Sequence, residues 1–560
     1  MVQLVEQKRF KRKKGQARGR YVDAEALSQI KALLADEPRQ RDLLIEYLHK
    51  IQDYYHSISV QHIAALAELM QLSQAEVYEV ASFYHHFDIV REEQSAEYDL
   101  TLRVCDSVSC EMQGSTQLIQ ELEKNLSSSI RIQKVPCVGR CACAPVIVAG
   151  TQVIEHASLQ KVKIALENND IKATVPADYI DYKAYVDQAG YQLLNDCIKG
   201  ERTVESVIQQ LTDSNLRGLG GAGFPLGRKW SILRNQTAGR YVAVNIDEGE
   251  PGTFKDRYYL EKDPHRFLEG TLIAAWAIEA EAVYIYLRDE YAGIRTMLEK
   301  ELAQLQANPS AELPPIYLRR GAGAYICGEE SAMIESIEGK RGMPRLRPPF
   351  LAEVGLFGRP TLEQNMESLY WVRDIVEKGA EWFTSEGRHE RQGLRSFSVS
   401  GRVNKPGVHF APAGITMREL IDEYCGGMLP GHELYGYFPG GASGGILPAS
   451  LDHLPLDFDT LQEHGCFIGS AAIIVMSNQD SARQLALNAM RFFAHESCGQ
   501  CTPCRVGTVK AVALMEQEKW DIPLLQELST VMMDSSICGL GQAAPNPLLC
   551  AIKYFPQEFE

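Results

Sequence analysis

The sequence predicts a multidomain α/β protein, in which a helical segment, a small cysteine-bearing sheet, a larger α/β sheet and a helical end follow one another. Three observations predict it. The length of 560 residues exceeds what one hydrophobic core usually serves. Strand, glycine turn and helix alternate through the middle of the chain, which is typical of an α/β sheet. Two cysteine groups with metal-ligand spacing, one on each side of that sheet, indicate smaller domains.

Composition and charge limit the classes of protein to which the chain can belong. The formal net charge is −16 and the isoelectric point is near 5.4, which argues against general binding of nucleic acid or lipid surfaces. No run of about eighteen apolar residues and no signal-peptide pattern occurs, so we expect a cytoplasmic protein without a membrane segment. In that compartment the fourteen cysteines are expected as metal ligands or free thiols rather than disulfides.

The N-terminal part of the chain combines a basic tail with helices. Residues 1–20 carry eight basic side chains and little apolar pattern. Such a segment is typical of a disordered tail, or of an arm that docks on an acidic partner subunit. Apolar residues then recur at helical spacing over 23–87, which predicts a small helical bundle.

Two cysteine pairs follow strands of a small predicted sheet. The strands span 98–104 and 130–135, and the pairs are Cys105 with Cys110 and Cys137 with Cys141. Thiolates on such loops suit a [2Fe–2S] cluster, because sulfide-bridged iron needs soft, deprotonated ligands. Zinc is the structural alternative, although its knuckles usually use C-x2-C pairs. Cys143 is a fifth thiol nearby, and Cys141 is preferred because it keeps the C-x3-C spacing.

A glycine loop is the first part of a candidate ligand site. Gly218-x-Gly220-x-x-Gly223 formally matches a dinucleotide fingerprint, but a polar helical segment precedes it where the fingerprint needs a strand. Pro225 also stands where a helix should continue, so an ordinary Rossmann turn is not expected. The loop is instead interpreted as a cradle for the phosphate of a flavin.

An acidic turn is the second part. A strand over 241–245 brings Asp247, Glu248 and Glu250 to its carboxyl end, where open α/β sheets bind ligands. A solvated loop is the simpler interpretation, but the surrounding glycines and proline indicate a shaped turn. Two further strands end in loops at the same edge, and a helix opening near Glu329 presents free N–H groups there.

The last third of the chain contains two segments with different predicted structures. Short alternating segments over 395–470 predict small strands, and the glycine run 440–445 is interpreted as a tight turn or docking surface, because no Lys-Ser/Thr follows it. Helices are then predicted from residue 482 onward. Among them lie Cys498, Cys501, Cys504 and Cys538. A C-x2-C-x2-C run with a distant fourth cysteine is typical of a [4Fe–4S] cluster, whereas zinc usually takes two separated pairs.

Several strings resemble one family. They are GLGGAGFP, NIDEGEPGTFKDR, YLRDEY, GAGAYICGEES, KRGMPRLRPPF and SCGQCTPCR. These are similar to motifs of the flavin- and NADH-binding subunit of respiratory complex I. A [2Fe–2S] segment fused in front, with the stretch 39–46, most resembles the beta subunit of NAD-dependent molybdenum or tungsten formate dehydrogenases. The diaphorase subunit of NAD-reducing hydrogenases shares this fused plan.

The resemblance implies a fold for each part of the chain. The expected units are a basic tail over 1–20, a helical bundle with a thioredoxin-like [2Fe–2S] domain over 21–175, a Rossmann-like α/β domain for FMN and NAD over 176–394, a ubiquitin-like β-grasp domain over 395–475, and a helical [4Fe–4S] domain over 476–560. Together they make an α/β multidomain protein.

The resemblance also implies roles for single residues. Glu250 is expected to be catalytic, and Phe224 and Phe350 are expected to sandwich the adenine of NADH. The residues expected to bind FMN or NAD(H) are Gly218, Gly220, Phe224, Lys229, Asn245, Asp247, Glu248, Tyr325, Gly328, Glu329, Glu330, Arg347, Phe350 and Asn365. The expected ligands are Cys105, Cys110, Cys137 and Cys141 for [2Fe–2S], and Cys498, Cys501, Cys504 and Cys538 for [4Fe–4S].

These cofactors together predict an electron-transfer function. NAD+ accepts a hydride, which is two electrons at once, whereas iron–sulfur clusters carry one electron each, and a flavin can exchange both ways. We therefore expect an oxidoreductase subunit that takes electrons from a partner through [4Fe–4S] and FMN to NAD+. Whether the [2Fe–2S] cluster lies on that path is left open.

The substrate half-reaction is expected on another chain, because no pterin site or nickel ligand pair occurs in this sequence. A molybdopterin formate dehydrogenase catalytic subunit, with Mo or W, is the first expectation. The alternatives are a NAD-reducing hydrogenase and an NADH:quinone oxidoreductase. A redox-sensing or scaffold protein with zinc in place of the clusters is the alternative from a different class, which flavin fluorescence and iron content would distinguish.

Overall fold

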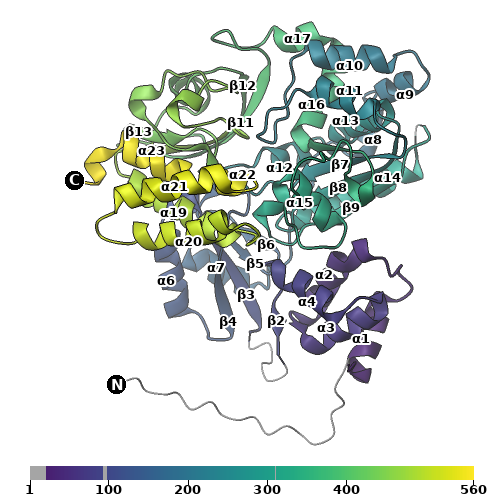
Figure 1. Ribbon diagram of the computed structural model, residues 1–560, viewed down its shortest axis with the longest axis horizontal. Helices are drawn as coiled ribbons and strands as arrows, with labels where there is room; N and C mark the ends of the chain where they lie inside the picture. Colours follow the sequence, from purple (N-terminus) through teal and green to yellow (C-terminus); the bar gives the residue numbers. More distant parts are fainter. Residues whose placement is uncertain (1–20, 92–97, 310) are drawn as a thin grey trace, which may run out of the picture.

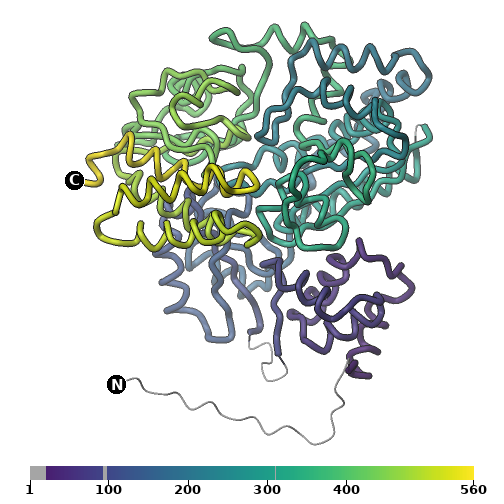
Figure 2. The backbone as a smooth tube through the Cα atoms, viewed as in Figure 1, coloured from purple at the N-terminus to yellow at the C-terminus, as the bar shows by residue number. Residues whose placement is uncertain are grey.

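A computed structural model describes residues 21–91, 98–309 and 311–560. The basic tail predicted over 1–20 lies outside the described residues. Figure 1 shows the N-terminal helices beside the large α/β domain, and the small cysteine-bearing sheet beside the C-terminal helices. The tube in Figure 2 shows the yellow-green helix α19 (Ala482–Glu496) beside the small cysteine-bearing domain, where it packs against α5 (Val108–Met112).

The predicted N-terminal bundle is confirmed. Its helices are α1 (Ala24–Leu34), α2 (Leu44–Tyr55), α3 (Val60–Met70) and α4 (Gln74–Phe83). Ser59 caps α3, and Ser73 with Glu76 forms a capping box at α4, so local sequence sets both starts. A pair of two-residue parallel strands, β1 (Ile58–Ser59) and β2 (Ile89–Val90), was not predicted, because strands so short show no alternation.

The small sheet has the strand order β4-β3-β5-β6. The strands are β3 (Leu100–Cys105), β4 (Ile130–Val135), β5 (Ile147–Ala149) and β6 (Gln152–Ile154), with α5 (Val108–Met112), α6 (Ser115–Asn125) and α7 (Leu159–Glu167) alongside. β3 and β4 are parallel, and Cys105 lies opposite Val135. This register brings the loops of both cysteine pairs to the same end of the sheet, as predicted.

The large sheet has four parallel strands in the order β10-β7-β8-β9. They are β7 (Arg240–Ile246), β8 (Ala280–Leu287), β9 (Ile316–Arg320) and β10 (Thr361–Asn365). The helices around them are α8 (Tyr182–Asp187), α9 (Gln192–Ile198), α10 (Val204–Asp213), α11 (Leu226–Arg234), α12 (Lys255–Leu260), α13 (Pro264–Ala277), α14 (Ala292–Ala307), α15 (Glu330–Ile337), α16 (Met366–Lys378) and α17 (Ala380–Thr384). The apolar run of β7 follows from its burial on both faces.

The glycine loop lies between two helices. α10 precedes it, so the expected absence of a fingerprint strand is confirmed. The expectation that Pro225 interrupts a helix is wrong, because α11 begins directly after it. Proline is tolerated at a helix start, where its missing N–H has no intrahelical partner.

The rest of the chain forms a mixed sheet and a helical end. The sheet, in the order β12-β11-β15-β13-β14, contains β11 (Leu394–Gly401), β12 (Gly407–Pro412), β13 (Leu434–Phe438), β14 (Leu447–Pro448) and β15 (Ala472–Ser477), with α18 (Met417–Glu419). The end contains α19 (Ala482–Glu496), α20 (Thr502–Met515), α21 (Ile522–Ser535), α22 (Gly539–Ala543) and α23 (Asn546–Tyr554). Within the described ranges, no helix has the length and apolar character needed to cross a membrane.

Candidate flavin, nicotinamide and iron–sulfur sites

The carboxyl edge of the large sheet collects the predicted flavin residues. β7 and β10 lie side by side, with Asn245 opposite Asn365 at their carboxyl ends. The acidic turn 247–252 follows β7, and the loop 321–329 follows β9. Parallel strands end at one edge of a sheet, so these segments converge there, as the sequence predicts.

The glycine loop closes on itself beside this edge. The N–H of Gly218 donates to the carbonyl of Phe224 at 2.9 Å, and the N–H of Gly223 donates to the carbonyl of Gly218 at 3.2 Å. A Cβ at Gly220 would lie 3.0 Å from the Cβ of Asn365. Glycine therefore lets the loop backbone approach the end of β10 more closely than any side chain would.

Lys229 and Asn245 meet at Glu363, a residue of β10. Nζ of Lys229 lies 2.9 Å from one carboxylate oxygen, and Nδ2 of Asn245 donates to the other at 3.2 Å. Asn245 also donates to the carbonyl of Gly328 at 2.9 Å. Burial lowers the pKa of Lys229, but Glu363 and Glu330 outweigh it and raise that pKa above its ordinary value. The site thus holds a charged ammonium group.

Asp247 has a buried oxygen that no described protein group satisfies. Its Oδ2 has no hydrogen-bond partner, and burial raises the pKa of Asp247 well above its usual range. Oε1 of Gln364 is also unpartnered, and the amide of that side chain lies near Gly218. Each such atom costs about 1–3 kcal/mol if left unpaired. The N–H donor of the FMN ring would satisfy an oxygen of this kind. Its phosphate would need loop amides other than those of Gly218 and Gly223, which are bonded within the loop.

Glu248 is engaged inside the protein. Its carboxylate accepts hydrogen bonds from the N–H groups of Asp256 at 2.8 Å and Arg257 at 3.2 Å, at the start of α12. Tyr291 donates its hydroxyl to the same carboxylate at 2.8 Å. Burial, followed by the charge of Asp256, raises the pKa of Glu248 to about 7. The structure therefore places this side chain on a helix terminus, whereas the resemblance implies contact with a cofactor.

Glu250 is held by groups from different parts of the chain. The hydroxyl of Tyr325 donates to Oε2 at 2.5 Å, and the N–H and hydroxyl of Ser443 donate to Oε1 at 2.8 and 2.9 Å. Ser443 lies in the glycine run 440–445, and Asn546 donates to its carbonyl at 2.9 Å. Burial raises the pKa of Glu250, while these donors lower it. The carboxylate is therefore fixed in position.

Arg347 joins the two acids at the start of α15. Its guanidinium donates to Glu330 at 2.6 Å and to Glu329 at 3.2 Å. The side chain of Glu329 also caps the helix, accepting from the N–H groups of Ser331 at 3.0 Å and Ala332 at 2.9 Å. The structure thus brings three of the predicted nucleotide-binding residues together at one helix terminus.

Phe224 and Phe350 present exposed rings. They expose 41% and 54% of their surface, respectively. The guanidinium of Arg228 lies 5.6 Å from the centroid of the Phe224 ring. Exposed aromatic rings can stack on a base, and the predicted adenine sandwich between Phe224 and Phe350 stays a prediction.

The first cysteine set is buried at one end of the small sheet. The Sγ atoms of Cys137 and Cys141 lie 3.2 Å apart. The thiol of Cys105, followed by that of Cys141, lowers the pKa of Cys137 well below its usual range, while Cys110 raises the pKa of Cys105. Cys143 is half-buried, and burial raises its pKa to about 11. The four adjoining thiols suit the iron of a [2Fe–2S] cluster.

These cysteines lie against the acidic turn. Arg288, which follows β8, donates to the carbonyl of Cys137 at 2.6 Å and also to the carbonyl of Glu248. Phe254 packs with Cys137 and Cys141 in one buried cluster. The [2Fe–2S] domain and the flavin domain therefore meet at the turn that presents Asp247 and Glu250.

The second cysteine set lies where α19, α20 and α22 meet. Cys498 and Cys501 lie in the turn before α20, Cys504 lies in its first turn, and Cys538 is the N-cap of α22. A Cβ at Gly541 would lie 2.8 Å from the Cβ of Cys504, so α22 closely approaches the turn. The geometry fits the predicted [4Fe–4S] ligand pattern.

Sequence reasoning missed Glu363, Ser443 and Glu496. Glu496 accepts the N–H of Tyr325 at 2.9 Å, which ties the [4Fe–4S] turn to the flavin domain. Side chains two residues apart in a strand point to the same face, so the sequence could have placed Glu363 on the same face as Asn365. No local signal indicates that Ser443 or Glu496 contacts this site, because both contacts form only between domains.

Comparisons with known families match three parts of the chain. Residues 30–170 match a thioredoxin-like [2Fe–2S] ferredoxin, residues 211–374 the Nuo51 FMN-binding domain, and residues 484–560 the NADH-ubiquinone oxidoreductase-F iron–sulfur binding region. These matches bear out the expected cofactors, FMN, [2Fe–2S], [4Fe–4S] and NAD(H), and the expected fold class.

Individual relatives agree. An NADH-quinone oxidoreductase subunit of Rhizobium meliloti (strain 1021) is 42% identical over 386 residues, which cover 66% of this chain and 91% of the relative. The mitochondrial NADH dehydrogenase [ubiquinone] flavoprotein 1 of Dictyostelium discoideum is 40% identical over 389 residues, covering 66% and 81%. A chain in the crystal structure of an NAD+-reducing [NiFe]-hydrogenase in the H2-reduced state superposes with a TM-score of 0.81, at 30% identity over 93% of each chain.

The cofactor regions, the site geometry and the relatives lead to one conclusion. The chain is an oxidoreductase subunit that acts with NAD. It belongs to the family of NADH-dehydrogenase-type flavin and iron–sulfur subunits.

Proposed function

We propose that this chain is the NAD+-reducing subunit of a formate dehydrogenase, and that it takes electrons from the formate-oxidising centre of a molybdopterin partner through [4Fe–4S] and FMN. The observation that carries the electron path is a chain of contacts. Glu496, beside the [4Fe–4S] turn, bonds the backbone of Tyr325, and the hydroxyl of Tyr325 bonds Glu250. Tyr325 therefore links the cluster turn, through its backbone N–H, to the candidate hydride-transfer site, through its hydroxyl.

The protein's own groups position and shield the reactants. FMN, when bound, supplies the exchange between single electrons and a hydride. The glycine loop, Lys229, Asn245 and Asp247 would hold it at the sheet edge. Tyr325 and Ser443 hold the carboxylate of Glu250 in place, and this preorganised group would face the nicotinamide when NAD(H) is bound. The eight predicted cysteines are proposed as the cluster ligands.

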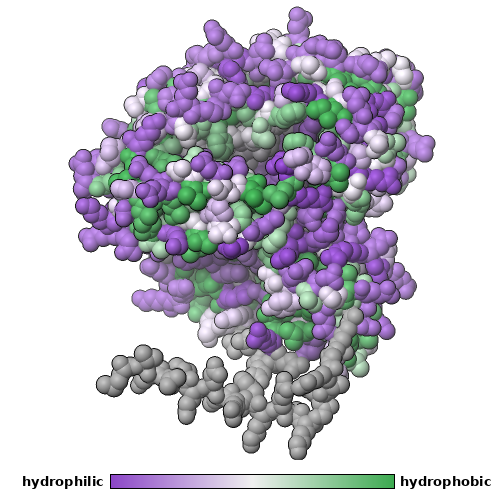
Figure 3. Space-filling model, viewed as in Figure 1, coloured by the Kyte–Doolittle hydropathy of each residue, from purple (hydrophilic) through white to green (hydrophobic). Residues whose placement is uncertain are grey.

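An exposed apolar face supports docking of a partner beside the [4Fe–4S] turn. Figure 3 shows hydrophobic side chains over α20 and α21. The exposed ones are Val506, Val509, Leu524, Val531 and Met533, of which Val509 exposes 57% and Val531 52%. Apolar faces of this kind often mark interaction sites. We assign this face to the electron-donating subunit.

A NAD-reducing hydrogenase is the second candidate. The choice of formate rests on the resemblance of the fused [2Fe–2S] segment and the stretch 39–46. The solved structure described above, in contrast, is that of a hydrogenase. A role in an NADH:quinone oxidoreductase is the third candidate, because several relatives are named as NADH-quinone oxidoreductase subunits.

Isolation with the native partner tests the choice. We expect NAD+ reduction that depends on formate, together with molybdenum or tungsten in the complex. Reduction by hydrogen with nickel present would assign the second candidate, and activity only with a quinone would assign the third. NADH:ferricyanide turnover in the same preparation is the control for an intact flavin module.

A further inference from the structure

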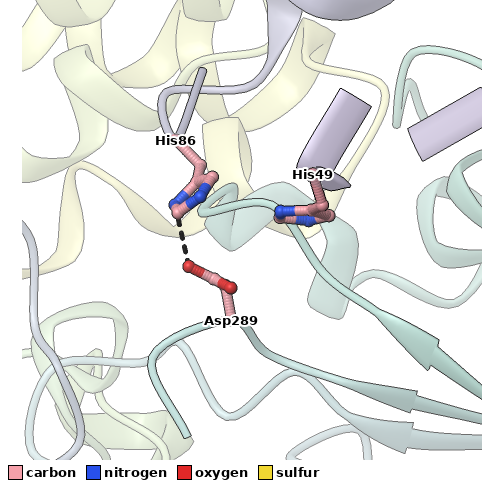
Figure 4. A group of neighbouring side chains, drawn as sticks. All are labelled: His49, His86 and Asp289. Atoms are coloured by element: carbon pink, nitrogen blue, oxygen red, sulfur yellow. Dashed lines mark ion pairs between the residues drawn. The ribbon is translucent and has the colours of Figure 1, made fainter. Parts of the chain in front are cut away.

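A group of ligand-type side chains lies where the N-terminal bundle meets the large sheet. Figure 4 shows His49, His86 and Asp289 facing one another. His49 belongs to α2, His86 follows α4, and Asp289 follows β8. Each offers a ligand atom within 4.8 Å of those of the other two, and the imidazole centroids are 4.9 Å apart. None of these residues belongs to the cofactor sites described above.

Hydrogen bonds determine which nitrogen of each ring is free. Nε2 of His49 lies 2.8 Å from the carbonyl oxygen of Gly321, which can only accept, so Nε2 carries the proton. Nδ1 of His86 lies 2.8 Å from one carboxylate oxygen of Asp289, whose other oxygen accepts from Arg320 at 2.5 Å. In the neutral rings, the lone pairs are therefore on Nδ1 of His49 and Nε2 of His86.

Both of these nitrogens are buried without a partner among the described residues. His49 as a whole is 1% exposed. Unpaired lone pairs in such places are destabilising unless a donor or a cation meets them. Metal-binding histidines typically donate the other ring N–H to a carbonyl or carboxylate, as His49 and His86 do here. Neutral imidazole nitrogens suit zinc and related transition metals.

The surroundings can accept a cation. The guanidinium of Arg320 bonds both Asp289 and Asp53, so two carboxylates offset its single positive charge. Arg295 lies farther from Asp289, at 3.4 Å. His86 and Asp289 also line a cavity of about 760 Å³, which is large enough to supply water ligands.

We propose that Nδ1 of His49 and Nε2 of His86 bind a divalent transition-metal ion of the zinc class, with water from the cavity completing its coordination. Asp289 and the carbonyl of Gly321 orient the two rings. The ion holds α2 and the segment after α4 against the carboxyl ends of β8 and β9. Cys137 and Asp247 line the same cavity, so this clamp supports the wall between the bundle and the cofactor sites.

Zinc K-edge X-ray absorption of the full chain, loaded with one equivalent of zinc, tests the proposal without interference from iron. We expect imidazole nitrogen and water scattering without sulfur. His49→Gln and His86→Gln should each lower zinc affinity at least tenfold, and glutamine at position 49 keeps an N–H donor for Gly321. Asp289→Asn should weaken binding about 10- to 100-fold, as loss of an orienting partner does.

His85→Gln is the matched control. His85, His495 and Glu496 form a second group of ligand-type side chains that lines the same cavity. The substitution removes one imidazole of that group and leaves His49 and His86 unchanged. Zinc affinity should not change in this variant. Sulfur ligation in the unaltered chain, no zinc binding, undiminished affinity in His49→Gln and His86→Gln, or loss in His85→Gln would each overturn the proposal. The absorption spectrum of the unaltered chain decides the ligand type even if a variant folds poorly.

Discussion

Three carboxylates of one turn have three different environments. Asp247 is buried with an unpartnered oxygen, Glu248 caps α12, and Glu250 is clamped by Tyr325 and Ser443. Their closeness in sequence suggests one shared role. Their environments instead indicate a candidate ligand contact, a structural cap and a candidate catalytic group.

Glu250→Gln should slow NADH:ferricyanide turnover about tenfold, which corresponds to about 1.4 kcal/mol, while FMN stays bound. The amide keeps the shape of the side chain but removes the charge that Tyr325 and Ser443 position. Steady-state rates and flavin content measure this. Glu312→Gln, at an exposed position, is the control. An unchanged rate would remove Glu250 from the mechanism.

Glu248 should make stability depend on pH. Its pKa is about 7 in the folded chain, against an ordinary value of 4.5. The stability that this group contributes is fully present below about pH 4.5 and is lost as the pH rises through about 7. Glu248→Gln lacks this titration, so its melting temperature should rise relative to the unaltered chain between pH 5.5 and pH 8. A difference in melting temperature that does not change with pH would contradict the assignment of this titration to Glu248.

At the scale of elements, the glycine run 440–445 has a function that its sequence conceals. A Cβ at Gly441 would lie 2.6 Å from Cγ of Glu250, and Gly441 has a φ of +72°. A side chain there would therefore both strain the backbone and displace the acid. The run is a tight turn, as predicted, and it also forms one wall of the site.

Ser443→Ala should shift the pH profile of NADH oxidation. Losing a hydroxyl donor to Glu250 raises the pKa of that acid further, so the acidic limb moves to higher pH. One hydrogen bond of this kind is worth about 1 kcal/mol, so kcat falls less than in Glu250→Gln. Ser443→Thr, which keeps the hydroxyl, should restore the profile. A parallel loss of rate at every pH would indicate only a structural role.

At the scale of the whole molecule, side chains of one domain donate hydrogen bonds to backbone carbonyls of another. Asn488 of α19 donates to the carbonyl of Asp106 at 2.7 Å, and Arg402, which follows β11, donates to that of Met112 at 2.7 Å. With Arg288 on the carbonyl of Cys137, these bonds lie around the loops that carry the candidate [2Fe–2S] cysteines. The cluster loops are therefore positioned by neighbouring domains as well as by their own sheet.

Cys504→Ser should separate the flavin reaction from the partner reaction. The serine hydroxyl is a poor ligand for iron, so the [4Fe–4S] EPR signal should disappear. Part of the NADH:ferricyanide activity should persist, because the candidate flavin residues lie on the large sheet, while NAD+ reduction by the native partner should be lost. An intact EPR signal would show that Cys504 is not a ligand.

Local patterns in the sequence predicted most elements and both cysteine sets, whereas the flavin and nicotinamide residues were expected from the resemblance to a known family. Apolar spacing predicted the bundle and the C-terminal helices, and cysteine spacing predicted both clusters, because helix period and ligand spacing are local properties. The predicted strand over 241–245 indicated that the acidic turn lies at the carboxyl edge of the sheet, and in the structure β7 and β10 end there side by side. Only the tertiary structure decided which of the turn's acids is free, that Ser443 and Glu496 join the site, and that His49 and His86 face each other. These contacts connect residues far apart in the chain, and no local period records them.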